Sequence, residues 1–222
     1  GPTRDIHHLT HSLSKDNGEF NTRVQVGCLD NPLNQGTGSA GFTIAINGPL
    51  DEYRNSLIYG QGIDAGLSKE GFIFIGEVQQ TLSLPETSIT LELSGSDSDE
   101  LTLSAFDNET LLGSVVSVVN IERLNGNIAL TTNYASLHGN PPEMNKHNWP
   151  NALENPDLFD KFWFSDWNIS GSKIAVNPDH VFGPILFNQF TVSRNVLKMT
   201  VQMPPLGADE NHQLKLQTRN KT

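Results

Sequence analysis

The clearest pattern of apolar and polar positions lies between residues 100 and 120. Residues 101–105 (LTLSA) alternate apolar and polar side chains, residues 107–110 (DNET) favour a turn, and a β-branched run follows over 111–119. Strict alternation on both sides of a polar turn is typical of a β-hairpin. The sequence therefore predicts two neighbouring antiparallel strands joined at residues 107–110.

Strand patterns continue on both sides of this hairpin, separated by Gly-, Pro- and Asn-rich turns. The predicted strands are 23–27, 42–46, 56–59, 71–75, 88–93, 121–132, 173–176, 181–187, 190–192, 196–203 and 213–218. Many short strands with regular turn signals are typical of a sandwich. The predicted fold is all-β, a two-sheet antiparallel β-sandwich of jelly-roll type. We expect a single domain over residues 21–222.

Three segments depart from the strand pattern. Residues 1–20 are polar and aperiodic, which predicts a flexible N-terminal lead-in. Residues 137–155 are rich in Pro and Asn, and a loop of this length is often functional. One short helix is predicted near 156–164, because Asn155 can cap it and Pro156 fits its first position. A strand that begins at Lys161 is the alternative.

The charge of the chain limits the classes of partner that it can bind. The net charge is −11, and the 14 basic residues are scattered, so no basic patch exists to bind nucleic acid. No apolar run is long enough to insert into a membrane. Cys28 is the single cysteine, which excludes an intramolecular disulfide. We interpret Cys28 as a small buried apolar side chain rather than a nucleophile.

The chemistry-bearing residues gather between positions 137 and 167, where all three tryptophans occur. Aromatic rings stack on sugars and on flat apolar ligands, and nearby polar groups fix their orientation. The predicted ligand-binding residues are Trp149, Trp163 and Trp167, with Tyr53 and Tyr59 added because they lie in or beside loops that favour exposure. The alternative is that Trp163 and Trp167 belong to the hydrophobic core.

The same region is compatible with catalysis. His138 or His147 would act as the base, and Glu143 or Asp160 as its acid partner. Such an enzyme would be a lyase, isomerase or cyclase without an organic cofactor, and a desolvated pocket would hold the reactive conformer.

Metal binding has one candidate site in the sequence. Asp97, Asp99 and Glu100 place three carboxylates in one turn, and calcium prefers such oxygen ligands. A solvated acidic turn is the simpler interpretation. His7, His8 and His11 lie close together but in the predicted lead-in, so metal bound there would be adventitious. Gly36, Gly38 and Gly41 match G-x-G-x-x-G without the strand and helix that a nucleotide site needs.

The stretch LTLSAFDNETLLGSVVSV (101–118) resembles the central strands of extracellular β-sandwich modules, including carbohydrate-binding modules. This resemblance identifies no functional residue. The leading hypothesis, which rests on the aromatic region, is an exported β-sandwich that binds a glycan or a small, partly apolar molecule. The second hypothesis is the cofactor-free enzyme. The third is a structural or adhesive surface protein, with a homodimer as its expected assembly.

Overall fold

The computed structural model describes residues 3–29, 31–36, 38–47, 62–133, 160–180, 185, 187–203 and 213–217. The chain divides into two compact units, Gly1–Asn177 and Pro178–Thr222, where the sequence predicted one domain over 21–222. No helix in the described ranges is long and apolar enough to cross a membrane.

The first unit is built from β-strands, with a single 3-10 turn at Ile121–Arg123 in its described part. The strands are β1 (Thr3–Leu13), β2 (Phe20–Cys28), β3 (Ser39–Ile46), β4 (Ile63–Ser68), β5 (Phe72–Ile75), β6 (Val78–Thr81), β7 (Ser88–Gly95), β8 (Glu100–Asp107), β9 (Thr110–Val118), β10 (Gly126–Asn133), β11 (Phe162–Ser170) and β12 (Ile174–Val176).

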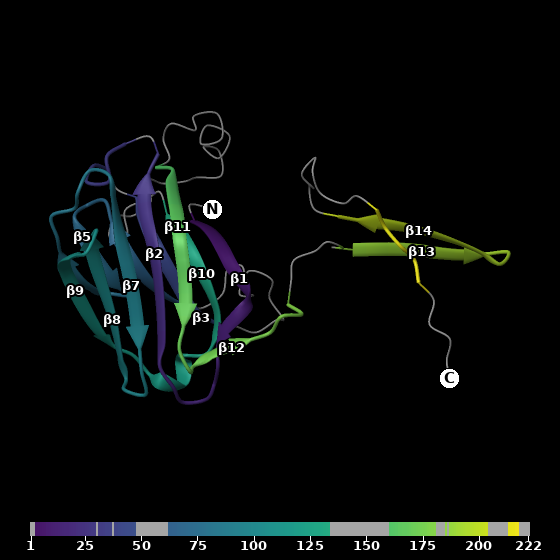
Figure 1. Cartoon of the computed structure of the whole chain (residues 1–222), viewed down its shortest axis with the longest axis horizontal. Coiled ribbons are helices and arrows are strands. Elements are labelled where there is room, and N and C mark those ends of the chain that lie inside the picture. Colours follow the sequence, from purple (N-terminus) through teal and green to yellow (C-terminus); the bar gives the residue numbers. More distant parts are fainter. Residues whose placement is uncertain are drawn as a thin grey trace, which may run out of the picture. The chain divides into compact units, whose positions relative to one another are not determined.

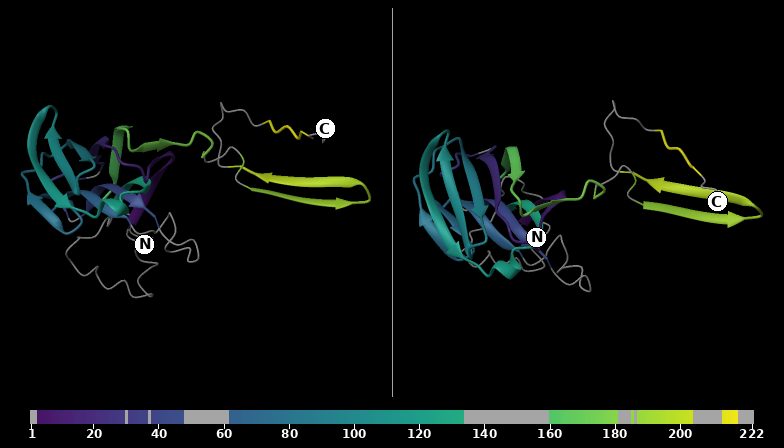
Figure 2. Two further views of the ribbon diagram at one scale, coloured as in Figure 1. Left: turned by 90° about the horizontal axis from the view of Figure 1, so that it is seen from below. Right: turned by 60° about the horizontal axis from the view of Figure 1, so that its bottom comes forward.

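These strands form two antiparallel sheets that face each other (Figures 1 and 2). Within the described residues, sheet A has seven strands in the order β12-β1-β10-β3-β4-β5-β6, and sheet B has five in the order β11-β2-β7-β8-β9. The predicted antiparallel β-sandwich of jelly-roll type is therefore confirmed. The predicted hairpin at 101–119 is confirmed as β8 and β9 at the edge of sheet B, with Asp107 paired to Thr110.

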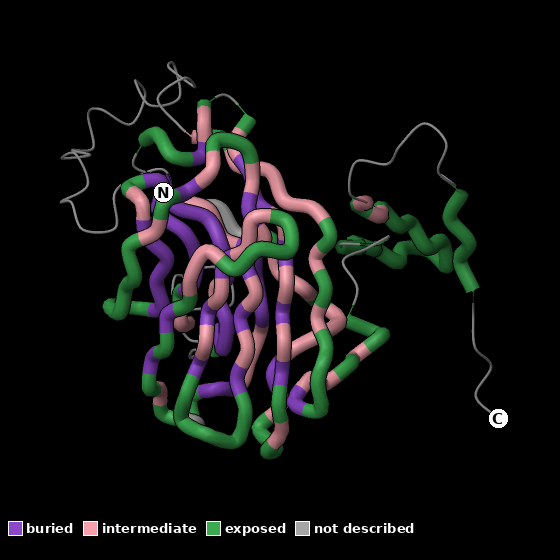
Figure 3. Tube along the Cα trace, turned by 60° about the vertical axis from the view of Figure 1, so that its left-hand side comes forward, coloured by how far each residue is buried: buried purple, intermediate pink, exposed green. Residues whose placement is uncertain are grey.

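The hydrophobic core lies between the two sheets. Along β7 the buried side chains Ile89, Leu91 and Leu93 are at most 1% exposed and alternate with polar residues that point outward. Buried and partly exposed segments alternate in the same way along the neighbouring strands (Figure 3). Side chains of both sheets belong to one apolar cluster. Full burial of each Leu or Ile contributes roughly 1.5–3 kcal/mol.

The N-terminal segment differs from the prediction of a flexible lead-in. Thr3–Leu13 is strand β1, which pairs with β10 and, through His11–Leu13, with β12. Its polar sequence hid the strand, because β1 lies near the edge of sheet A and most of its described side chains are only half-buried.

The short helix predicted near 156–164 is wrong over 162–164. Strand β11 begins at Phe162, as in the alternative interpretation, and pairs with β2. Phe162 and Phe164 are two positions apart and both pack against the core. Burial of these two rings from a strand outweighs the local preference for a helix start at Asn155 and Pro156. Residues 156–159 lie outside the described residues.

Strand β11 contains a bulge that changes which face its side chains occupy. The register with β2 shifts between Ser165 and Asn168, and Asp166 has a φ of 53°. A bulge adds one residue and reverses the inside-outside alternation beyond it. Trp167 therefore packs against the core, although Trp163 lies opposite Gly27 on the outer face.

The second unit contains the hairpin β13 (Phe187–Ser193) and β14 (Val196–Gln202). Its turn residues Arg194 and Asn195 have φ of 50° and 65°, as a two-residue hairpin turn requires. Directly paired residues share a face, and one face is apolar. That face holds Phe190 paired with Met199, Val192 with Leu197 and Asn188 with Val201.

Candidate functional site

The outer face of sheet B carries its polar side chains in rows that run across the strands. Residues paired directly between antiparallel strands have neighbouring side chains on one face. From β11 towards β9, row 1 holds Ser170, Asn21, Ser94, Thr102 and Val116; row 2 holds Asn168, Arg23, Glu92, Ser104 and Ser114; row 3 holds Ser165, Gln25, Thr90, Phe106 and Leu111; row 4 holds Trp163, Gly27 and Ser88. The members on β9 at the ends of rows 1 and 3 are exposed apolar side chains.

Hydrogen bonds tie rows 3 and 4 together. The Ser165 hydroxyl donates to Oε1 of Gln25 at 3.1 Å, and Nε2 of Gln25 donates to the Ser88 hydroxyl at 3.2 Å. This chain crosses β11, β2 and β7. These two hydrogen bonds fix the orientation of the Gln25 side-chain amide. An exposed glutamine without such partners would change rotamers freely.

Row 2 contains the charged groups of the face. Nη1 of Arg23 lies 3.7 Å from a carboxylate oxygen of Glu92, and its guanidinium lies 5.7 Å from the ring centroid of Phe106. Both charged side chains are partly exposed, so this ion pair contributes little to stability. Its effect on the site is to compensate the arginine charge and to hold the guanidinium beside an aromatic ring.

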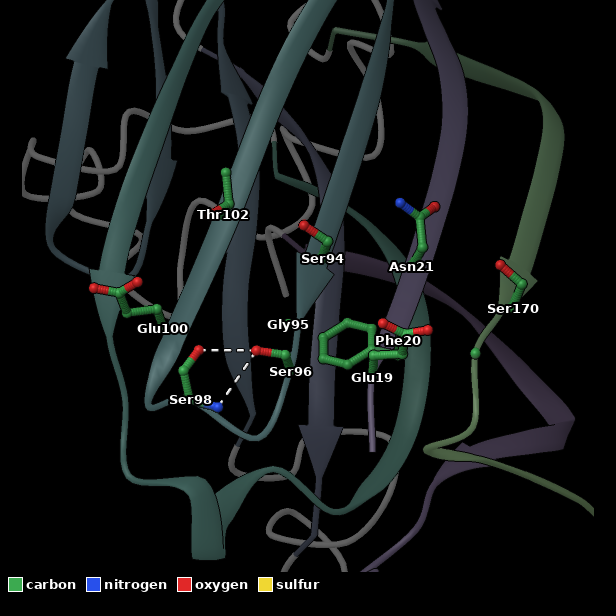
Figure 4. Close-up of a pocket in the computed structure, with 11 residues that line it drawn as sticks. Glu19, Phe20, Asn21, Ser94, Gly95, Ser96, Ser98, Glu100, Thr102 and Ser170 are labelled. Atoms are coloured by element: carbon green, nitrogen blue, oxygen red, sulfur yellow. Dashed lines mark hydrogen bonds between the residues drawn. The ribbon is translucent and has the colours of Figure 1, made fainter. Parts of the chain in front are cut away.

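A pocket of about 480 Å³ opens at the row 1 end of the face (Figure 4). Its volume lies within the range of about 300–1,000 Å³ that is common for ligand sites. The pocket is lined by hydroxyl, amide and carboxylate groups, namely Asn21, Ser94, Thr102 and Ser170 of row 1 together with Glu19, Ser96, Ser98 and Glu100.

The loop between β7 and β8 shapes one side of the pocket. The hydroxyls of Ser96 and Ser98 are hydrogen-bonded at 2.9 Å (Figure 4), and Asp97 accepts a hydrogen bond from the backbone N–H of Gly18. The Asp97 contact attaches this loop to the segment before β2. The pocket is thus bordered by two connected loops as well as by the strands.

Trp163 lies at the opposite end of the face, in row 4. Its half-buried indole covers Gly27 so closely that a Cβ at Gly27 would come within 2.5 Å of the ring. Only glycine leaves room for this packing. The indole therefore has a fixed position on the outer face, where the residue is partly exposed.

Trp167 has a different environment. Its indole N–H donates to the Thr22 hydroxyl at 3.0 Å, and its ring lies 5.0 Å from that of His8 in an edge contact. Thr22 is fully buried. This geometry favours the core interpretation of Trp167. The other predicted ligand-binding residues, Trp149, Tyr53 and Tyr59, lie outside the described residues.

Asp160, predicted as an acid partner of a histidine, lies beside a lysine. Its Oδ1 is 2.6 Å from Nζ of Lys69 in a largely buried ion pair. Cys28, predicted to be a buried apolar side chain, packs against the core and also lies 3.4 Å from the same Nζ. The remaining predicted catalytic residues, His138, His147 and Glu143, are outside the described residues.

The acidic turn lies next to the pocket, since Glu100 lines it. Among the described residues there is no group of three His, Cys, Asp or Glu side chains that could hold a metal ion. The turn formed by Asp97, Asp99 and Glu100 is therefore not such a group, and calcium binding stays a prediction.

His8 and His11 of β1 form a small aromatic cluster with Trp167. The ring centroids of His8 and His11 are 4.4 Å apart in an edge contact, and the Thr10 hydroxyl lies 2.8 Å from Nδ1 of His11. Burial and, secondarily, the neighbouring His11 charge hold the pKa of His8 below its ordinary value. Neutral His8 can pack against the edge of Trp167 without the cost of burying a charge.

The polar rows were not predicted as a site. The alternation of β2, β7 and β8 is visible in the sequence, but the rows depend on strand pairing between segments up to 150 residues apart, which alternation does not specify. The usable signal was the unusual share of Ser, Thr, Asn and Gln at the outward positions of adjacent strands.

No family model matches this chain, and no curated protein matches it. Among solved structures, it is similar to lectin I-B4 from Griffonia simplicifolia in its metal-free form, with 11% identity, a TM-score of 0.46, and coverage of 77% of this chain and 80% of that one. Lectin UEA-II in complex with galactose shows 10% identity, a TM-score of 0.48, and coverage of 77% and 83%.

A third similar structure is the CBM2 module of the evolved Dit of Lactobacillus casei BL23 phage J-1. It shows 15% identity and a TM-score of 0.32, with coverage of 81% of this chain and 71% of that one. These identities and scores are too low to transfer a ligand, a metal or a site to this chain.

Proposed function

We propose that the protein binds a glycan along the outer face of sheet B. The observation that carries the proposal is the pairing register, which joins the polar pocket at row 1 and the indole of Trp163 in row 4 on one face. A sugar offers hydroxyl groups to the first and an apolar ring face to the second.

The chemistry of the pocket supports this ligand class. Carboxylates of Glu19 and Glu100 accept hydrogen bonds from sugar hydroxyls, while the Asn21 amide and the Thr102 hydroxyl both donate and accept. The proposed ligand is a neutral glycan, because the lining carboxylates and the net charge of −11 would repel an acidic one.

The distance along the face favours an oligosaccharide over a single sugar. Asn21 and Gly27 are six residues apart on β2, which corresponds to about 20 Å at roughly 3.3 Å per residue. A single sugar ring reaches only one end of this distance. An oligosaccharide that lies along β2 can contact the pocket and the indole together.

An extracellular location is also part of the proposal. It rests on the resemblance of residues 101–118 to extracellular β-sandwich modules and on the proposed ligand class. A cell-fractionation experiment with the source organism tests it independently of binding.

The binding experiment compares variants at both ends of the face. Neutral oligosaccharides are screened on a glycan array, and the strongest ligand is titrated by calorimetry against wild type, Asn21→Ala, Thr102→Ala and Trp163→Ala. Thr131→Ala is the matched control, because its hydroxyl is bonded to Thr43 at 2.7 Å on sheet A. We expect Trp163→Ala to weaken binding about tenfold or more, which corresponds to about 1.4 kcal/mol.

The pocket variants should each weaken binding several-fold, and Thr131→Ala should bind like wild type. Equal affinity of all four variants and wild type would place the ligand elsewhere on the molecule. No binding of any neutral oligosaccharide by wild type would reject the proposal.

A further inference from the structure

The pair formed by Lys69 and Asp160 lies where β11 begins, three residues before Trp163. Lys69 directly follows β4 of sheet A, and Asp160 precedes β11 of sheet B by two residues. Nζ of Lys69 is 2.6 Å from Oδ1 of Asp160, with side-chain exposures of 0% and 12%. An amine and a carboxyl group are thus held together almost without water.

The surroundings hold both groups in place. The backbone N–H of Gly38 donates to Oδ2 of Asp160 at 3.2 Å, and Sγ of Cys28 and the Phe162 ring lie 3.4 Å and 5.9 Å from Nζ of Lys69. A Cβ at Gly38 would lie 2.8 Å from Oδ2 of Asp160. The loop before β3 therefore encloses the carboxyl group closely only because it has glycine here.

We propose that Lys69 and Asp160 condense to an isopeptide bond that joins sheet A covalently to the start of β11. The reaction converts the ammonium and carboxylate groups into one amide and one water molecule. It needs no oxidant, reductant or activating cofactor, since the oxidation state of every atom is unchanged.

The atoms balance as follows. A proton moves from Nζ to Oδ1 along the 2.6 Å contact, which leaves a neutral amine beside a carboxylic acid. Nζ attacks Cγ of Asp160 and forms the C–N bond. A second proton moves from Nζ to Oδ1, the Cγ–Oδ1 bond breaks, and Oδ1 leaves as water with both protons. Oδ2 stays as the amide oxygen.

The environment favours this step in three ways. A buried ion pair is costly because two charges leave water, and the neutral amide removes both charges. In the tetrahedral intermediate the negative charge develops on Oδ2, where the Gly38 N–H already donates, as in an oxyanion hole. The fold holds the amine and the carboxyl group in contact. Their effective concentration is therefore far higher than that of two side chains free in solution, where this reaction does not proceed at a useful rate.

The bond would connect residues 91 positions apart in the chain. Closure of a loop of this length restricts the unfolded chain strongly. It also fixes the start of β11, the strand that carries Trp163. The cross-link therefore confers resistance to unfolding and keeps the edge of sheet B attached.

Intact-mass spectrometry of the denatured full chain tests the proposal directly. The expected mass is one water molecule below that of the sequence, and tandem spectra of a digest should show one branched peptide pair joined through Lys69 and Asp160. A wild-type mass equal to that of the sequence overturns the proposal, whether or not any variant folds.

Variants then identify the two residues that lose the water molecule. Lys69→Arg keeps the positive charge but lacks the amine, and Asp160→Ala lacks the carboxyl group, so both should have full mass. Lys173→Arg is the matched control. Lys173 is equally buried, but its Nζ donates to the backbone carbonyl of Asp16 at 2.8 Å, so this variant should still lose one water. Loss of water in Lys69→Arg would assign the dehydration to another site and overturn the proposal.

Discussion

The indole N–H of Trp167 donates to the hydroxyl of Thr22 at 3.0 Å, from the edge strand β11 to a fully buried position of β2. Each group supplies the partner that the other needs in an environment with little water. Loss of one partner leaves a buried polar group unsatisfied, whereas loss of both does not.

Trp167→Phe should therefore lower the free energy of unfolding by about 1–3 kcal/mol, since the Thr22 hydroxyl loses its donor. Thr22→Val should have a similar cost. The double variant should be more stable than the sum of the two effects predicts. Urea unfolding of the four proteins measures this coupling, and strict additivity would show that the bond is not formed.

Acid should destabilise the first unit through His8. Its pKa is held below the ordinary 6.5 by burial first and by His11 second, so the unfolded chain binds more protons as the pH falls through 6.5. The free energy of unfolding should decrease until the pH is below the folded pKa. His8→Asn should have a weaker decrease between pH 7.5 and 5 in urea titrations.

The exposed His180, outside β1, provides the matched control. His180→Asn should show the pH dependence of the wild type. An equal reduction by both variants would mean that His8 is not responsible.

Gly41 and Gly66 face each other across β3 and β4, and substitution of either should be costly. A Cβ at Gly41 would lie 2.3 Å from the Ala65 carbonyl oxygen, so the paired backbones must separate. Gly41→Ala should lower the free energy of unfolding by about 1–3 kcal/mol. Gly113→Ala would meet only the Leu82 side chain, which can move, and should cost clearly less in the same measurement.

The first unit should fold without the C-terminal hairpin, because every residue of its described core cluster precedes Asn177. A chain truncated after Asn177 should keep a single cooperative thermal transition. It should also associate less than the full chain in light scattering, because β13 and β14 expose an apolar face that includes Phe190 and Val192 at 63% and 67%. Equal association of both chains would exclude the hairpin as the cause and count against a homodimer formed through it.

The strands with clear alternation were predictable from sequence. Residues 88–93 and 196–203 correspond to β7 and β14. Alternation did not reveal that β14 belongs to the second unit, where it pairs with β13, because period two shows that a face is apolar but not what covers it. Strand β1 was missed because its sequence lacks an apolar alternation. Its position near the edge of sheet A requires few buried apolar side chains.

The candidate site was predictable only in part. Trp163 was proposed as a ligand-binding residue from its residue type. That it lies on the opposite face of the sheet from Trp167 depends on the bulge, and no sequence motif predicts this bulge. The glycines 36 and 38, which resemble a nucleotide motif, instead lie against the carboxylate of Asp160. Their role depends on a residue more than 120 positions away, beyond the reach of local patterns.

The bulge at Asp166 decides on which face of sheet B each tryptophan of β11 lies. Without the bulge, two residues four positions apart, as Trp163 and Trp167 are, would lie on one side of the sheet. With it, one edge strand both seals the interior and presents an aromatic ring to solvent. Deletion of the bulge residue would leave the two tryptophans three positions apart, and a regular strand would still place them on opposite faces. The bulge and the four-residue spacing therefore have to change together.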